Sequence, residues 1–189
     1  MTNLNPLFAV DFYKTGHKDQ YPENTQYVFS NFTPRSSRIA VDYGAVLPDF
    51  DNRVVFLGLQ GFIKTFLIDA FDEGFFNRPK DEVINEYRET MDNALGEGAV
   101  TTGNLEELHD LGYIPLEIKA LPEGSRVNIG VPMYTVINTL PNFYWLVNYL
   151  ETIISSETWK PSTNATIAYE YKRLLTRYAV LTGAPVDFV

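Results

Sequence analysis

The sequence has 189 residues, of which 45% are hydrophobic and 14% aromatic, so a large core can form and disorder is not expected. Its 15 lysines and arginines against 24 aspartates and glutamates give a formal charge of -9, which argues against nucleic acid or anionic membranes as partners. The absence of cysteine excludes disulfides and thiolate metal sites, and it favours a reducing, cytoplasmic location. No apolar run approaches the ~20 residues that span a bilayer.

Short elements are predicted along the first half of the chain. Asp11 is expected to cap a helix that ends before Tyr21-Pro22, because its side chain can accept hydrogen bonds from the free N–H groups of the first turn. Apolar periodicity then predicts strands over 26–32 and 53–57, helices over 59–70 and 81–95, and a shorter helix capped by Asn104.

From Leu116 onward, strand-like runs alternate with turn residues, which predicts a small β meander over 116–121, 126–129 and 132–138. Two helices follow, from about Asn142 and from Ser162 to just before Gly183. The residues expected to face inward are Leu146, Val147, Leu150, Ile153 and Ile154 in the first, and Ile167, Leu174, Leu175, Tyr178 and Leu181 in the second. Residues 184–189 are expected to be strand-like.

The order of these elements lacks a strict alternation of strand and helix, so the predicted fold class is α+β, a mixed sheet with packed helices. We divide the chain into an α+β domain over 1–140 and a helical segment over 141–189. None of the common catalytic motifs occurs. His17 and His109 lie far apart in sequence and not at metal-ligand spacing, so no metal site is expected and no catalytic residue is assigned.

The segment 11–22 is unusually rich in functional groups. One interpretation makes Asp11 a cap, Phe12 a core anchor and the lysines a solvated face. The other makes Tyr13 a stacking platform for a flat ring, with cations nearby for phosphate. After the strand at 26–32, Arg35 and Arg38 are either ordinary surface residues or ligands for phosphate oxygens.

Five segments together resemble the N-terminal part of the nicotinamide phosphoribosyltransferases, in the family's order and spacing: DFYKTGHKDQYP, FTPR, VVFLGLQGFI, IPLEIKALPEG and YWLVNYLETIISSETWKPSTNAT. The resemblance implies a pentosyltransferase of NAD salvage that makes nicotinamide mononucleotide and pyrophosphate from nicotinamide and phosphoribosyl pyrophosphate. It also implies use of Mg²⁺ and ATP by the complete enzyme. The family's members are homodimers in which the N-terminal helix of one subunit completes the site of the other.

By this resemblance Tyr13 would stack on the nicotinamide ring, Asp11 would lie close to it, and Arg35 would reach the phosphates of the partner's substrate. Lys14 and His17 also match the family, but we assign them no catalytic step. The fold implied is the N-terminal domain of a type II phosphoribosyltransferase, cut before the α/β barrel that carries most catalytic groups. We therefore expect the chain to be inactive without a complementing C-terminal chain.

Two alternatives remain open. The chain could be a non-catalytic module for dimerisation or for binding a partner, using an exposed apolar face on its last two helices. It could also belong to the related nicotinate phosphoribosyltransferases, which share the architecture and differ in how they recognise the ring substituent.

Overall fold

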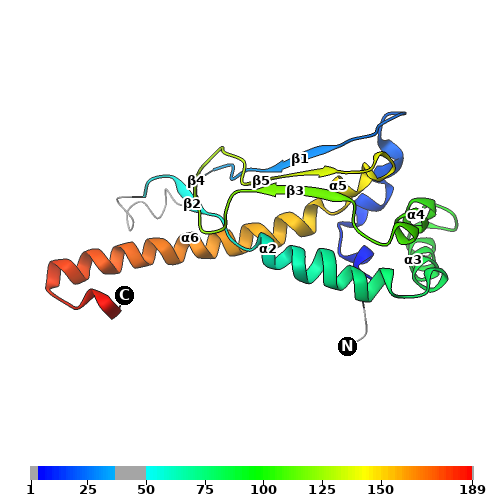
Figure 1. The fold of residues 1–189 in the computed structure, drawn as a ribbon. Coiled ribbons are helices and arrows are strands. Elements are labelled where there is room, and N and C mark those ends of the chain that lie inside the picture. Colours follow the sequence, from blue (N-terminus) through cyan, green and yellow to red (C-terminus); the bar gives the residue numbers. More distant parts are fainter. Residues whose placement is uncertain (1–3, 37–49, 189) are drawn as a thin grey trace. The chain divides into compact units, whose positions relative to one another are not determined.

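The computed structural model describes residues 4–36 and 50–188, and its mixture of small sheets and helices confirms the α+β class (Figure 1). The strands are β1 (Phe29–Phe32), β2 (Arg53–Val55), β3 (Leu116–Ala120), β4 (Arg126–Asn128) and β5 (Tyr134–Asn138). The α-helices are α2 (Leu59–Phe62), α3 (Lys80–Leu95), α4 (Gly103–Leu111), α5 (Trp145–Tyr149) and α6 (Glu151–Thr182). The 3-10 helices are η1 (Pro6–Phe8), η2 (Phe12–Gln20), η6 (Pro141–Phe143) and η7 (Val186–Phe188), and η4 (Ile63–Ala70) and η5 (Asp72–Phe76) are π-helical.

The strands form two sheets, one in the order β1-β5-β3 and one made of the antiparallel pair β2-β4. The predicted β meander is therefore wrong, because β4 leaves its sequence neighbours to pair with β2, with Val54 opposite Val127. The turn before β4 explains this choice. The backbone N–H of Gly124 donates to the carbonyl of Phe56 at 2.8 Å, and Phe56 N–H donates to Ser125 at 3.0 Å, so the turn itself is fastened to the end of β2.

The chain forms two compact units that are interleaved in sequence. The first comprises Met1–Ser30, Leu59–Lys119 and Thr135–Ser156, and the second comprises Asn31–Gly58, Ala120–Tyr134 and Glu157–Val189. The sequence-based boundary at residue 140 stays a prediction.

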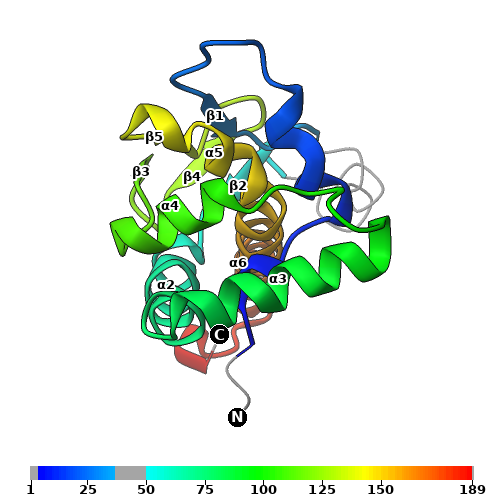
Figure 2. The ribbon, with the colours of Figure 1, turned by 90° about the vertical axis from the view of Figure 1, so that its right-hand side faces the viewer.

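The core of the first unit lies among the helices. Phe71 and Phe75, from the helical run that α2, η4 and η5 form together, are completely buried. Tyr87 of α3 stacks on Phe8 with ring centroids 5.7 Å apart, and the hydroxyl of Tyr149 donates to the carbonyl of Leu7 at 2.8 Å. Helices α3 and α4 pack against each other, as Figure 2 shows. These contacts fix η1, and with it the start of η2, on the helical core.

In the second unit, helix α6 passes through Pro161, although a proline normally ends or bends a helix. The neighbouring residues Leu57 and Gly58 accommodate the proline. Gly58 has φ +104°, and a Cβ there would lie 2.7 Å from the Pro161 ring. Ser162 Oγ accepts from the N–H of Leu57 and donates to its carbonyl, both at 3.1 Å. The predicted helix start at Ser162 is consequently wrong, because these partners accommodate the proline within one helix.

The predicted burial of the last two helices holds for most of the first set and fails for most of the second, with Ile153 and Leu174 half-buried. Leu146, Val147, Leu150 and Ile154 are buried, whereas Ile167, Leu175, Tyr178 and Leu181 are exposed. Helix α6 ends as predicted, before Gly183 in the left-handed conformation (φ 73°). The strand expected after it is absent from the described residues, where η7 forms instead.

Candidate substrate-binding site

The first candidate residue, Asp11, precedes η2 in the first unit. Its backbone is extended, and its carbonyl accepts from the N–H of Lys14 at 2.9 Å. The predicted side-chain cap is wrong, because the carboxylate accepts no hydrogen bond from the backbone N–H groups of the first turn. Asp11 Oδ2 instead accepts from Thr152 Oγ1 of α6 at 2.6 Å. The carboxylate is thus fixed in place by a residue 141 positions later in the sequence.

Tyr13 lies in the first turn of η2 and is 59% exposed. Its ring centroid lies 5.0 Å from that of His17, and Lys14 Nζ lies 5.6 Å from the same ring. A hydrogen bond to Asp11 raises the pKa of Tyr13 above its ordinary value, so the phenol stays protonated at neutral pH. The ring is therefore supported along the helix and still accessible. Phe12 is 51% exposed, so its predicted role as a core anchor is wrong.

Lys14 has a different role from the solvated face predicted for the lysines. Its side chain is only 4% exposed, and Nζ donates to Asn148 Oδ1 and to Glu151 Oε2, both at 2.6 Å. Lys14 thereby joins η2 to α5 and to the beginning of α6.

Lys18 is also engaged. Its ammonium donates to the carbonyl and the hydroxyl of Thr101, each at 2.6 Å, and to Asn104 Oδ1 at 2.7 Å. Burial lowers the pKa of Lys18. Since an ammonium has three donors, all of them are used, and Lys14 and Lys18 act as anchors of η2. Asn104, the predicted cap of α4, accepts a hydrogen bond from Lys18 instead, and the N-cap of this helix is Thr102.

His17 faces the same anchor. Its Nδ1 lies 3.0 Å from Asn148 Nδ2, so one asparagine contacts both Lys14 and His17. Burial raises the pKa of Tyr21, and a hydrogen bond with the same Asn148 side chain opposes this increase. Sequence reasoning assigned no task to Asn148, and no local signal could have found it, because its partners lie more than 130 residues away.

Arg35, the third candidate, belongs to the second unit and follows β1. The backbone beside it is fixed, because Gly130 N–H donates to the carbonyl of Pro34 at 2.9 Å. The Arg35 side chain is exposed and makes no hydrogen bond or ion pair to any residue of 4–36 or 50–188. Among the described residues, therefore, nothing occupies the Arg35 guanidinium. Arg38 lies outside the described residues.

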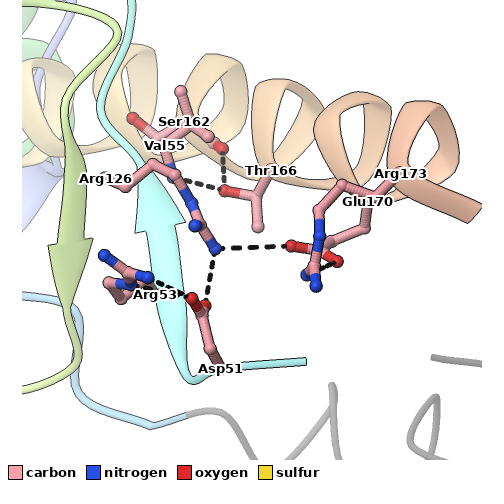
Figure 3. Close-up of polar contacts among 8 residues, drawn as sticks. All are labelled: Asp51, Arg53, Val55, Arg126, Ser162, Thr166, Glu170 and Arg173. Atoms are coloured by element: carbon pink, nitrogen blue, oxygen red, sulfur yellow. Dashed lines mark hydrogen bonds and ion pairs between the residues drawn. The ribbon is translucent and has the colours of Figure 1, made fainter. Parts of the chain in front are cut away.

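A polar cluster that the sequence did not reveal joins β2, β4 and α6 in the second unit (Figure 3). Arg126 Nη2 donates to Asp51 Oδ1 at 2.6 Å and lies 3.7 Å from Glu170 Oε1. Arg53 donates to the other oxygen of Asp51 through two nitrogens, at 2.8 and 2.5 Å, and Arg173 donates to Glu170 Oε2 at 2.7 Å.

The burial of Glu170 indicates the role of this cluster. Glu170 is 3% exposed and is held between two arginines, and the Arg126 guanidinium lies 4.5 Å from the centroid of the Tyr169 ring. Asp51 and Arg126 are 75 residues apart in sequence, so only the folded chain shows that they pair. The opposite charges pair, although the buried Glu170 Oε1 and Arg126 Nε make no hydrogen bond within the described residues, and we interpret the cluster as a structural clamp of the second unit.

The described residues gather no set of three or more histidine, aspartate or glutamate side chains that could hold a metal ion. In the same described ranges, no helix is both long and apolar enough to cross a membrane.

The fold defines a class of protein. The structure superposes on human nicotinic acid phosphoribosyltransferase with a TM-score of 0.59 and 19% identity, over 93% of this chain and 29% of that one. Over the matched region the chain has the fold seen in that phosphoribosyltransferase, which agrees with the predicted fold. At this identity the likeness concerns the fold alone.

Residues 5–91 match the model of the nicotinamide phosphoribosyltransferase N-terminal domain. The chain is 61% identical over 186 residues to the nicotinamide phosphoribosyltransferase of Acinetobacter baylyi, and 26% identical over 191 residues to that of Mycoplasma pneumoniae. These matches cover 98% and 99% of this chain but only 36% and 42% of those relatives. The chain is thus similar over nearly its whole length to nicotinamide phosphoribosyltransferases, and its residues 5–91 are similar to their N-terminal domain, which confirms the resemblance seen in its sequence.

Proposed function

We propose that this chain is the N-terminal portion of a nicotinamide phosphoribosyltransferase, and that it acts only together with the remainder of such an enzyme. The reaction joins nicotinamide to phosphoribosyl pyrophosphate and yields nicotinamide mononucleotide and pyrophosphate. The pyridine nitrogen attacks the anomeric carbon while pyrophosphate leaves, through a transition state with cationic character on the ribose. Such a reaction depends on positioning and on charge stabilisation more than on proton transfer.

The observation that carries this proposal is the accessible ring of Tyr13 on a firmly anchored η2. Tyr13 is 59% exposed, whereas Lys14, the next residue, is buried against Asn148 and Glu151. An exposed aromatic ring on a rigid support suits a stacking platform for a flat heterocycle. The relatives' name and the 61% identity support nicotinamide as that heterocycle.

Asp11 favours the amide over the acid. Its carboxylate hydrogen-bonds to Tyr13 and to Thr152, so it lies at the edge of the platform with its charge fixed. A negative charge there attracts the amide N–H groups of nicotinamide and repels the carboxylate of nicotinate. Asp11 therefore favours nicotinamide over nicotinate as the substrate. The likeness to the human nicotinic acid enzyme, at 19% identity, does not support nicotinate as the substrate.

Arg35 is proposed to hold phosphate oxygens of phosphoribosyl pyrophosphate. Its exposed guanidinium offers a planar fork of donors that matches phosphate geometry, and it has no protein partner among the described residues. In a homodimer these phosphates would belong to the substrate bound by the partner subunit. We propose such a homodimer, or a separate C-terminal chain that completes the site.

Magnesium and ATP are expected of the complete enzyme, and magnesium would supply charge stabilisation to the leaving pyrophosphate. Among the described residues, no three or more histidine, aspartate or glutamate side chains gather into a metal site. A cytoplasmic location is proposed as well, because a chain without cysteine suits a reducing compartment.

The proposal is tested with a joined enzyme, in which this chain replaces the corresponding N-terminal part of the Acinetobacter baylyi relative. Tyr13→Ala should raise the KM for nicotinamide by a factor that corresponds to the free energy of stacking, about 1 to 3 kcal/mol. Tyr13→Phe should keep most of the affinity. Phe12→Ala, the neighbouring exposed aromatic, is the matched control. An unchanged KM in Tyr13→Ala would remove Tyr13 from the site and move support to the non-catalytic binding module.

A further inference from the structure

The anchor of η2 contains a chain of hydrogen bonds that determines where the proton of His17 resides. Lys14 Nζ is 2.6 Å from Asn148 Oδ1, and Asn148 Nδ2 is 3.0 Å from His17 Nδ1. An ammonium can only donate, so the oxygen of the Asn148 amide must face Lys14. The NH₂ group of Asn148 then faces His17, and Nδ1 must be the acceptor. Only an imidazole without a proton on Nδ1 can accept this bond.

We propose that Lys14 and Asn148 hold His17 as the neutral tautomer with its proton on Nε2, and that this uncharged donor makes His17 a specificity-determining residue for a pyridine ring with an uncharged carboxamide. This inference rests on the proposed function. An imidazolium would carry N–H groups on both nitrogens and would turn one of them against the NH₂ group of Asn148.

The position of His17 gives its charge state a consequence for binding. Its ring lies 5.0 Å from the ring of Tyr13, which is the proposed platform. Within residues 4–36 and 50–188, Nε2 of His17 has no hydrogen-bond partner, so its N–H remains available to an acceptor on a ligand. The acidic groups of the same anchor are already engaged, Glu151 with Lys14 and Asp11 with Thr152 and Tyr13.

A neutral donor beside the platform can donate a hydrogen bond to the carbonyl oxygen of a carboxamide without attracting the full charge of a carboxylate. An imidazolium at the same place would attract nicotinate by an ion-pair contribution. The hydrogen-bond chain Lys14–Asn148–His17 therefore favours nicotinamide over nicotinate, as the carboxylate of Asp11 does. It has this effect because it keeps His17 uncharged.

The tautomer can be measured on this chain alone by nitrogen NMR of the imidazole rings at neutral pH. The chain has only two histidines, and His109 is an internal reference, because its Nε2 lies 3.0 Å from the carbonyl of Arg78 and must be protonated. We expect His17 to carry its proton on Nε2 and none on Nδ1. A protonated Nδ1, in either the other tautomer or the imidazolium, would overturn the proposal.

The variant that tests the relay is Asn148→Asp, which keeps an acceptor for Lys14 and places an acceptor opposite Nδ1. His17 should then carry a proton on Nδ1, whereas Asn85→Asp, an exposed asparagine of α3, should leave its tautomer unchanged. In the joined enzyme, Asn148→Asp should shift the ratio of kcat/KM for nicotinate over nicotinamide upward by about threefold to tenfold. An unchanged ratio with a moved proton would refute the specificity role. Inactivity of the unsubstituted joined enzyme would contradict the proposed function instead, and the NMR result would still decide the relay.

Discussion

Lys14 and Glu151 form an ion pair at 2.6 Å in which the lysine side chain is 4% exposed and the glutamate side chain 55%. This difference in exposure predicts that removing one partner lowers the free energy of unfolding more than removing the other. Glu151→Gln leaves a buried ammonium without its counter-charge and should lower the free energy of unfolding by about 1 to 3 kcal/mol. Lys14→Met leaves a carboxylate that water can solvate, so its loss should be smaller.

Urea unfolding of both variants measures the difference. Lys64→Met, which breaks an exposed pair with Asp69, serves as the control and should change the free energy by no more than about 0.5 kcal/mol. A larger loss for Lys14→Met than for Glu151→Gln would show that packing of the lysine stem outweighs the charge.

The cluster around Asp51 predicts a loss of stability in acid. Partial burial alone would raise the pKa of Asp51, but hydrogen bonds from Arg53 and Arg126 outweigh it and lower the pKa below the ordinary value. An aspartate with a lowered pKa stabilises the fold above its unfolded pKa of about 3.9, and this contribution disappears as the pH falls through the folded value.

Thermal unfolding at pH 6 and at pH 3 tests this. The unsubstituted chain should lose more of its Tm between the two conditions than Asp51→Asn, which has no charge to lose. Equal losses in the two proteins would mean that Asp51 does not stabilise the second unit through its charge.

Arg35 should act on one substrate only. In the joined enzyme, Arg35→Ala should raise the KM for phosphoribosyl pyrophosphate by about tenfold or more, as expected for a lost charge-assisted hydrogen bond, and should leave the KM for nicotinamide unchanged. Arg35→Lys should recover only part of the affinity for phosphoribosyl pyrophosphate, because an ammonium lacks the planar fork of donors. Steady-state kinetics decide, with Arg177→Ala on the exposed face of α6 as the control. Equal effects on both substrates would point to a structural role.

The exposed apolar residues of α6 should drive self-association of the isolated chain. Leu175 and Leu181 are 55% and 69% exposed, and exposed apolar surface of this kind favours association. Light scattering should show a smaller mass for Leu175→Glu/Leu181→Glu than for the unsubstituted chain. Leu95→Glu, an exposed leucine at the end of α3, should not change the mass. A monomeric unsubstituted chain at all concentrations would refute the prediction.

Local patterns predicted the position of most elements, since turn residues and apolar periodicity act over a few neighbours, although the side-chain caps expected of Asp11 and Asn104 do not form. They placed η2, α3 and the end of α6 almost to the residue. They failed where a distant partner decides. Pro161 stays helical because Gly58 lies against it, and β4 pairs with β2 because the turn before β4 bonds Phe56.

The candidate site shows the same limit. Tyr13, Asp11 and Arg35 could be named from the sequence through a family resemblance, and their binding roles stay predictions. Asn148 could not be named, because its importance arises from two partners on η2 that are distant in sequence. The burial of Lys14 was likewise invisible, since a lysine on a short polar helix is ordinarily exposed.

The most direct test measures formation of nicotinamide mononucleotide from nicotinamide and phosphoribosyl pyrophosphate, with magnesium and ATP. The assay is run with this chain alone, with the separately produced remainder of the Acinetobacter baylyi relative alone, and with both together. Product only in the mixture is the predicted result, because it requires each part to supply what the other lacks. Product from this chain alone would contradict the assignment of most catalytic groups to the other part, and no product from the mixture or from the joined enzyme would contradict the proposed function.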